Sequence, residues 1–269
     1  MKYDQLINKE FHKLQRNKLF KDKERFIYNE ISHRINLSID SINLQFSSCL
    51  EIGYSSNIIY QYIYKKFPKI DYYIADISKK ILKDQLHVKN SIYLDHDKWN
   101  VDNDKFDLII SNLYLNLTNN LGVLFQNLYC SLKEKGFLIV TFPGKNSLDE
   151  LKKCMIEADL EIYEGAYRRF IECHSINDIT NILNKENFKI PVIEIDTIKL
   201  RYKKFTTLLN DIRYLGNSNI YKDRKDNFEN KKYFQKVEDI YWKKYSNNEE
   251  LILHLEVIFI SAWKDKILK

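Results

Sequence analysis

The sequence predicts an α/β fold in which a mostly parallel sheet carries helices on both faces. Three observations support this prediction. Short apolar runs typical of buried strands alternate with segments whose apolar residues recur at helical spacing. The first run, 46–50, leads into Glu51 and then Gly53, which is the only glycine among the first 121 residues. A second run, 72–75, ends on another acid, Asp76.

The same patterns place the individual elements along the chain. Up to residue 142, helices are expected over 3–37, 58–66, 79–86 and 119–133, and strands over 46–50, 72–75, 91–94, 106–113 and 137–142. Beyond it, helices are expected over 147–159, 177–183, 206–215 and 230–245, and strands over 192–202 and 251–263. We expect Gly136 to end helix 119–133 in a left-handed conformation. Ser147 and Glu150 have the S-x-x-E spacing of a capping box.

These elements suggest a simple domain organisation. An N-terminal helical segment, 1–40, precedes a single domain over 41–269, with helical insertions near 145–188 and 204–245. The segment 1–40 would either cover a ligand site or pack on the sheet, and the sequence favours neither.

Composition and charge exclude several classes of protein. Hydrophobic content of 44% and charged content of 30% are typical of a globular protein, and no run approaches the 18 apolar residues of a transmembrane helix. The net charge of +6 comes from scattered lysines, which favours a solvated surface over a nucleic-acid partner. Four cysteines without C-x-x-C spacing indicate free thiols. We therefore expect a cytoplasmic location, with peripheral membrane contact left open.

The ends of the predicted strands carry the candidate site residues. An acid-x-glycine turn between a strand and a helix is typical of nucleotide-binding βαβ units, and a ribose-binding acid follows about 20 residues later. Glu51 and Gly53 are therefore interpreted as the cofactor turn and Asp76 as the ribose acid. After the third strand, Asp97 could accept the adenine amino group, with Asp95 as the competing choice. Trp99 could then cover the adenine ring.

Longer motifs show a family resemblance. They are LEIG at 50–53, FDLIISNL at 106–113, LKEKGFLIVTF at 132–142, GKNSLDELKK at 144–153, DTIKLRY at 196–202, LLNDIRYLGNSN at 208–219 and AWK at 262–264. With these motifs the chain resembles the class I S-adenosylmethionine-dependent methyltransferases. Within that class it is similar to the malonyl-carrier O-methyltransferases of biotin biosynthesis (BioC) and to the mitochondrial complex I assembly factor described as a protein-arginine hydroxylase.

The resemblance implies a Rossmann-like, seven-stranded methyltransferase sheet whose last strand is antiparallel. It also implies S-adenosyl-L-methionine at the carboxyl ends of the first two strands. The residues expected to bind this cofactor are Glu51, Gly53, Ser55, Asp76, Ile77, Asp97, Lys98, Ser111 and Asn112. Among them, Glu51 and Gly53 would line the methionine half, and Ser111 and Asn112 the wall near the sulfonium.

The turn departs from the family pattern of acid-x-Gly-x-Gly-x-Gly at two positions. Ser55 and Asn57 stand where the second and third glycines would be. A non-glycine residue in left-handed geometry costs about 1–2 kcal/mol. If both residues carried this cost and all of it fell on binding, cofactor affinity would drop roughly 30- to 700-fold.

The resemblance supports two functions. The first is methyl transfer to a carboxylate on a small molecule or carrier protein, such as a malonyl-carrier thioester. Its candidate cationic anchors are four arginines, although for each the sequence favours an ordinary surface residue: Arg168, Arg169, Arg213 and Arg224. No catalytic residue is assigned.

The alternative is a role in respiratory complex I assembly, with a complex I subunit as partner, either as a protein-arginine hydroxylase or as a scaffold. No metal is expected, because His254-x-Glu256, the one suitable spacing, reads more readily as ordinary strand residues. Nucleic-acid methylation is disfavoured, since no [DNS]-P-P-[YFW] motif follows the fourth strand.

Overall fold

Apolar runs that are buried along most of their length form the first strands. The computed structural model describes residues 6–18, 25–85, 87–95, 97–215, 219–224 and 229–264. The strands are β1 (Ser48–Ile52), β2 (Asp71–Asp76), β3 (Asn90–Tyr93), β4 (Phe106–Asn112), β5 (Leu132–Pro143), β6 (Lys189–Tyr202), β7 (Ser246–Asn247) and β8 (Glu250–Lys264). The helices are α1 (Lys9–Lys18), α2 (Phe26–Asp40), α3 (Asn57–Lys66), α4 (Lys79–Asp84), α5 (Leu121–Ser131), α6 (Asp149–Tyr163), α7 (Ile176–Lys185), α8 (Phe205–Tyr214) and α9 (Lys231–Tyr245). Every residue of β1 is buried, as expected for a parallel strand covered on both faces.

The strands form one mixed sheet in the order β3-β2-β1-β4-β5-β8-β6, with the two-residue β7 paired to β8. The neighbours from β3 to β5 pair in parallel, and β8 runs antiparallel to both β5 and β6. This confirms the predicted mostly parallel sheet with an antiparallel last strand. The strand order places the carboxyl ends of β1, β2 and β4 at one edge, where ligands bind in open α/β sheets.

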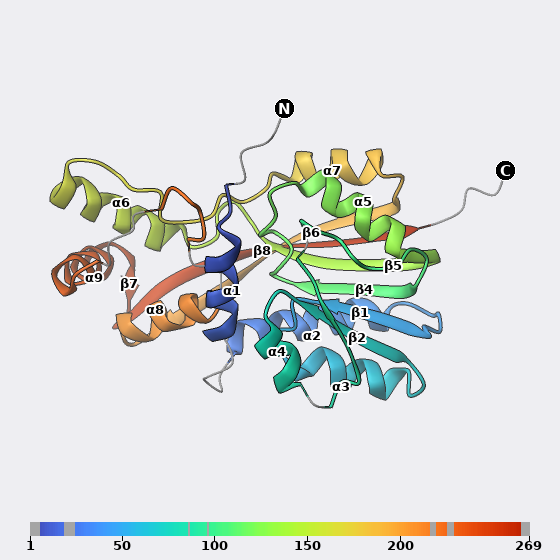
Figure 1. Ribbon diagram of the computed structural model, residues 1–269. Helices are drawn as coiled ribbons and strands as arrows, with labels where there is room; N and C mark the ends of the chain where they lie inside the picture. Colours follow the sequence, from blue (N-terminus) through green and yellow to red (C-terminus); the bar gives the residue numbers. More distant parts are fainter. Residues whose placement is uncertain are drawn as a thin grey trace.

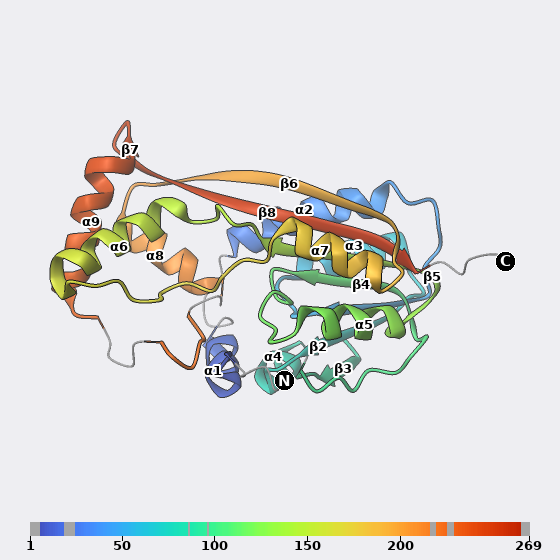
Figure 2. The same ribbon diagram turned by 90° about the horizontal axis from the view of Figure 1, so that it is seen from above.

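Helices cover both faces of the sheet, as predicted. Figures 1 and 2 show α2 and α3 on one face and α5 and α7 on the other. Each face has its own buried cluster, which includes Ile31 and Ile35 of α2 on one side and Leu124 and Phe125 of α5 on the other. The long strands β6 and β8 extend beyond the rest, and α6, α8 and α9 gather at their far ends (Figure 2).

Three local predictions were wrong. The helix expected over 3–37 is divided into α1 and α2, with 19–24 outside the described residues. Gly136 has no positive φ and lies within β5, which begins directly after α5, while Lys135 has a φ of 61°. The capping box does not form, because Leu148 is the N-cap of α6. The Ser147 hydroxyl donates instead to the Glu256 carbonyl oxygen, and the Glu150 carboxylate contacts His254.

Those two side chains find their partners on β8, which is more than one hundred residues away in sequence. A tertiary contact thus replaces a local one at the start of α6. Across the described ranges, no helix combines the length and the apolar character needed to cross a membrane.

Candidate functional site

The turn from β1 into α3 depends on Gly53. Its φ is 76°, and its amide donates to the Ala75 carbonyl oxygen at 2.7 Å. A Cβ atom at this position would lie 2.1 Å from Cγ of Tyr114, so only glycine fits beneath that ring. The Tyr114 hydroxyl oxygen accepts a hydrogen bond from the Ile77 amide at 3.3 Å. The Tyr114 side chain therefore spans the gap between the β1 turn and the end of β2.

The expected strain at Ser55 and Asn57 is absent. Neither residue has a positive φ, and Asn57 is already the first residue of α3. Ser56 is the N-cap of α3, with its hydroxyl accepting from the Ile58 amide at 3.4 Å. The chain therefore makes this turn with one left-handed residue, Gly53, and the predicted loss of affinity from two strained residues does not apply.

Glu51 lies fully buried at the end of β1. Its Oε2 accepts a hydrogen bond from the Tyr72 hydroxyl at 2.6 Å, and its buried Oε1 lies near the Ser55 backbone without a well-formed hydrogen bond. Burial raises the pKa of Glu51 to about 7, and the Tyr72 hydroxyl only partly opposes that rise. The site thus contains a carboxyl group that exchanges its proton near neutral pH.

Asp76 lies at the end of β2, as predicted, and is fully buried. Its carboxylate accepts from the Ser78 amide at 2.8 Å and forms an ion pair with Arg16, whose Nη2 lies 2.5 Å from Oδ2. Arg16 also donates to the Tyr54 carbonyl oxygen at 3.1 Å. The predicted ribose acid is therefore bound by a side chain of α1, and the sequence patterns missed this partner.

Asp97 is bound in the same way. Lys9 of α1 lies 2.6 Å from its Oδ2 and 3.0 Å from the Asp95 carboxylate. The Asn119 side-chain amide and the Thr118 hydroxyl also donate to Asp97, at 2.6 and 3.2 Å. Both acids that the sequence offered for the adenine amino group thus lie together under α1.

Two neighbours of these acids lie elsewhere. The Lys98 side chain is exposed, and its amide bonds back to the Asp95 carbonyl oxygen at 2.7 Å. The Trp99 indole donates to the Ser131 hydroxyl at 3.0 Å and packs with the α5 cluster. That the Trp99 ring covers a ligand stays a prediction, and in this structure the ring packs between sheet and helix.

The end of β4 holds Ser111 and Asn112, both buried. The Ser111 hydroxyl donates to the Ile52 carbonyl oxygen at 2.9 Å, which ties β4 to β1. The Asn112 amide donates to the Tyr28 carbonyl oxygen and the Ser32 hydroxyl, each at 3.1 Å, which anchors α2. Here these two polar side chains fasten neighbouring elements to the strand end.

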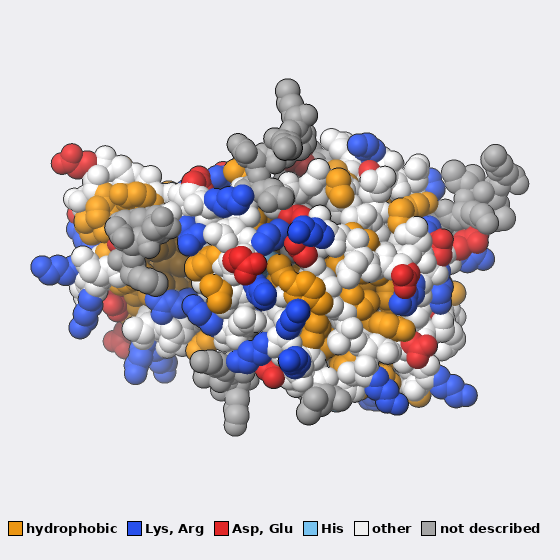
Figure 3. Space-filling model, viewed as in Figure 1, with side chains coloured by type: hydrophobic (Ala, Val, Ile, Leu, Met, Phe, Trp, Pro, Cys, Tyr) orange, Lys and Arg blue, Asp and Glu red, His pale blue; other side chains and the backbone are white. Residues whose placement is uncertain are grey.

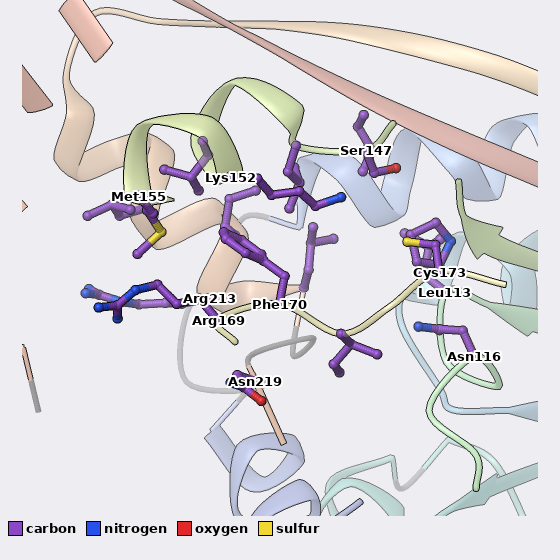
Figure 4. A pocket seen from close by; sticks show the side chains of 18 of the residues that line it. Leu113, Asn116, Ser147, Lys152, Met155, Arg169, Phe170, Cys173, Arg213 and Asn219 are labelled. Atoms are coloured by element: carbon purple, nitrogen blue, oxygen red, sulfur yellow. The ribbon is translucent and has the colours of Figure 1, made fainter. Parts of the chain in front are cut away.

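A cavity of about 220 Å³ lies beyond the end of β4, between α6 and α8. Its wall is largely apolar and comprises Leu113, Asn116, Pro143, Ser147, Leu148, Leu151, Lys152, Met155, Arg169, Phe170, Ile171, Cys173, Leu209, Ile212, Arg213, Leu215, Asn219, Phe234 and Leu255. Figure 4 shows Arg169 and Arg213 at one end of this cavity and Leu113 and Asn116 at the other, with Lys152 reaching in from α6. Figure 3, which has the same view as Figure 1, shows hydrophobic side chains in a hollow beside α1.

The four predicted anchor arginines differ in position. Arg169 lines the cavity but is held by two carboxylates, those of buried Asp159 and of Glu229. Arg213 lines it from α8 and is exposed, with a hydrogen bond to the Asn210 side chain at 3.3 Å.

The other two do not line the cavity. Arg168 stacks on Tyr221, with its guanidinium carbon 3.9 Å from the ring centre, and Arg224 stacks on Phe11 at 4.0 Å. Sequence patterns missed Lys152, whose lysine-rich surroundings gave no distinguishing signal.

No group of three or more side chains suited to a metal ion occurs in the part of the chain that the structure describes. His254 and Glu256 lie on β8 and have protein partners. The His254 ring contacts Glu150, and Glu256 accepts from the Asn146 side-chain amide at 2.9 Å. These contacts favour the interpretation of both as structural strand residues.

Comparison with known proteins adds to this geometry. The chain matches the family described as "Methyltransferase domain" over residues 8–194, which is more than half of its length. This chain belongs to the methyltransferase domain family. The match includes α1 and the three acids that α1 binds, Asp76, Asp95 and Asp97.

Curated relatives of this methyltransferase domain carry two different names. One is the mitochondrial arginine-hydroxylase NDUFAF5 of Dictyostelium discoideum, which is 27% identical over 88% of this chain and 59% of its own length. The human protein of that name is 25% identical over 74% of this chain and also 59% of its own length. The chain thus spans less than two thirds of these relatives. A malonyl-[acyl-carrier protein] O-methyltransferase 2 of Ilyobacter polytropus is 27% identical over 91% of this chain and 93% of its own length.

Solved structures support the fold. The YcgJ protein of Bacillus subtilis matches with a TM-score of 0.56 and 11% identity, covering 87% of this chain and 99% of its own. A phosphoethanolamine N-methyltransferase 2 of Haemonchus contortus in complex with S-adenosylhomocysteine matches at 0.50 and 16% identity, covering 87% of this chain and 53% of its own. At such identities, the likeness concerns the architecture alone.

The residues of this methyltransferase domain fit an S-adenosyl cofactor in type. Carboxylates follow β2 and β3, and Gly53 leaves a surface that a Cβ would block. In this structure, however, Arg16 and Lys9 already engage those carboxylates, and the Tyr114 ring lies over Gly53. The carboxylates are therefore of a suitable kind for the cofactor, but the chain's own side chains fill the space beside them.

Proposed function

We propose that this chain is an S-adenosylmethionine-dependent methyltransferase whose acceptor combines an apolar body with a carboxylate. One observation carries the proposal. Two consecutive residues after β4 serve two different sites, because Tyr114 lies over the glycine turn and Leu113 lines the cavity between α6 and α8. A cofactor site and an acceptor site that share one strand end would bring donor and acceptor together.

The cavity suits an acceptor of this class. S-adenosylmethionine, when bound, supplies a methyl group activated by its sulfonium. The chain must align the acceptor with it and exclude water. The side chains of Leu151, Met155 and Phe170 provide an apolar wall, and Lys152 and Arg213 provide positive charge for an anion. A malonyl thioester on a carrier protein has both features, and the Ilyobacter relative is named for that substrate.

Two measurements test the proposal. Calorimetric titration with S-adenosylhomocysteine tests cofactor binding, and transfer of labelled methyl groups to a malonyl-carrier protein tests the acceptor. Lys152→Met and Arg213→Met should each raise the KM for the acceptor roughly tenfold or more, because a hydrogen bond to a charged group contributes about 1.5–3 kcal/mol. Arg201→Met is the control, since Arg201 is exposed on β6 and does not line this cavity. Cofactor binding without transfer to any carboxylate would contradict the acceptor class.

A second function is favoured by the ion pairs of α1. Because Arg16 and Lys9 occupy the predicted cofactor acids, the chain could act in complex I assembly as a hydroxylase-like protein or a scaffold. The arginine-hydroxylase names of the first relatives agree with that role. Failure to bind S-adenosylhomocysteine up to millimolar concentration, together with capture of a respiratory-chain subunit, would favour it. The cytoplasmic location stays a prediction.

A further inference from the structure

Helix α1 buries a polar face. His12 and Arg16, one helical turn apart, are 0% and 1% exposed, whereas Leu14 is 54% exposed. A surface helix of a globular protein normally buries its apolar stripe. This face of α1 is therefore held mainly by charge and hydrogen bonds, while Phe11 at its edge packs against the small cluster of Ile7, Leu117 and Ile220.

Those interactions converge on the predicted cofactor acids. Arg16 pairs with Asp76, and its guanidinium carbon lies 4.7 Å from the centre of the Tyr114 ring. The His12 ring lies 5.6 Å from the same ring. His12, Arg16 and Tyr114 therefore lie together over the turn at Gly53.

The neighbouring residues of α1 extend the same pattern. Lys9 pairs with Asp95 and Asp97, and the Asn17 side-chain oxygen accepts from the Ser78 hydroxyl at 2.6 Å. Cationic side chains of α1 therefore satisfy the acids after both β2 and β3. These are the acceptor atoms that ribose hydroxyls and an adenine amino group would use.

We propose that α1 is an internal competitor of the nucleoside part of the cofactor, so that Arg16 and Lys9 must leave Asp76 and Asp97 before an S-adenosyl ligand binds. This inference rests on the proposed function, since it assigns those acids to the cofactor. Asp76 is 0% exposed beneath Arg16, so ribose hydroxyls can reach its oxygen atoms only after that guanidinium moves away. Arg16 and Lys9 would be hydrated once α1 withdraws, and the ligand would take over their hydrogen bonds.

Removing the competitor should therefore tighten binding. In calorimetry with S-adenosylhomocysteine, Arg16→Gln and Lys9→Ala should each lower the Kd, with at least a tenfold change for Arg16→Gln. Glutamine retains much of the volume of arginine, and Lys9→Ala provides an independent test if the first variant folds poorly. Arg34→Ala is the control, because Arg34 forms ion pairs with Glu30 and Asp196, away from this site.

Hydrogen exchange on the full chain gives a readout independent of activity. S-adenosylhomocysteine should accelerate amide exchange over 9–18 while it protects the turn at 51–57. Ligand-induced protection of α1, or unchanged affinity in both variants, would overturn the inference and leave the proposed function intact. If neither the natural chain nor any variant binds the ligand, the proposed function and the inference both fail.

Discussion

Replacing Glu51 by glutamine should change how stability depends on pH. The carboxyl group is fully buried, and its pKa is raised from a usual value of 4.5 to about 7. The folded state therefore holds more protons than the unfolded chain between about pH 4.5 and pH 7, so stability falls as pH rises through that window. Because one pKa unit corresponds to about 1.4 kcal/mol, the natural chain should lose about 2–3 kcal/mol between pH 5 and pH 8 from this group alone. Glu51→Gln lacks this titration.

The assay is urea denaturation of both proteins at pH 5 and pH 8. The change in the free energy of unfolding between the two pH values is then compared between the natural chain and Glu51→Gln. Contributions of other titrating groups, including the histidines, cancel in that comparison. Glu194→Gln on β6 is the matched control, since that side chain is exposed and its replacement should leave the pH difference unchanged. If the natural chain and Glu51→Gln lost stability equally over this interval, the argument that burial keeps this carboxyl protonated would be refuted.

Two further substitutions test the packing around the sites. Gly53→Ala should destabilise the fold by about 2–5 kcal/mol, because it adds left-handed strain and a clash with Tyr114; a thermal melt with an unchanged midpoint would contradict this. Arg169→Met should lower the free energy of unfolding by about 3–5 kcal/mol, because it leaves buried Asp159 without its cation. Arg168→Met, which removes a more exposed ion pair, should lower it by less than about 1 kcal/mol. Equal denaturation midpoints for these two variants would show that Arg169 is not structural.

The sequence predicted the sheet because its information there is local. The runs that form β1 to β5 pair in parallel with one another, and the acids Glu51 and Asp76 occupy strand ends as their spacing indicated. The parallel crossover rule then brings these ends to one edge. The positions of the predicted site residues therefore follow from the order of elements, without any knowledge of side-chain packing.

The partners of those residues could not be predicted in the same way. Arg16 is sixty positions from Asp76, and nothing in its helix distinguishes it from other surface cations. The same reason explains why Glu150 contacts the distant His254 and does not form the predicted capping box. A motif identifies what a side chain can do locally, while the choice between local and distant partners depends on which elements the fold brings together.

In this structure, cofactor binding is hindered by side chains at the N-terminal helix α1 and not by strain in the turn. The replacement of glycines by Ser55 and Asn57 suggested a strained turn, yet neither residue is left-handed. What fills the space is the Tyr114 ring, with the Arg16 guanidinium packed beside it. Side chains can leave an ion pair or change rotamer, whereas backbone strain would persist as long as the turn is folded. The altered turn is therefore compatible with an active methyltransferase, provided that α1 withdraws and the Tyr114 ring moves off Gly53.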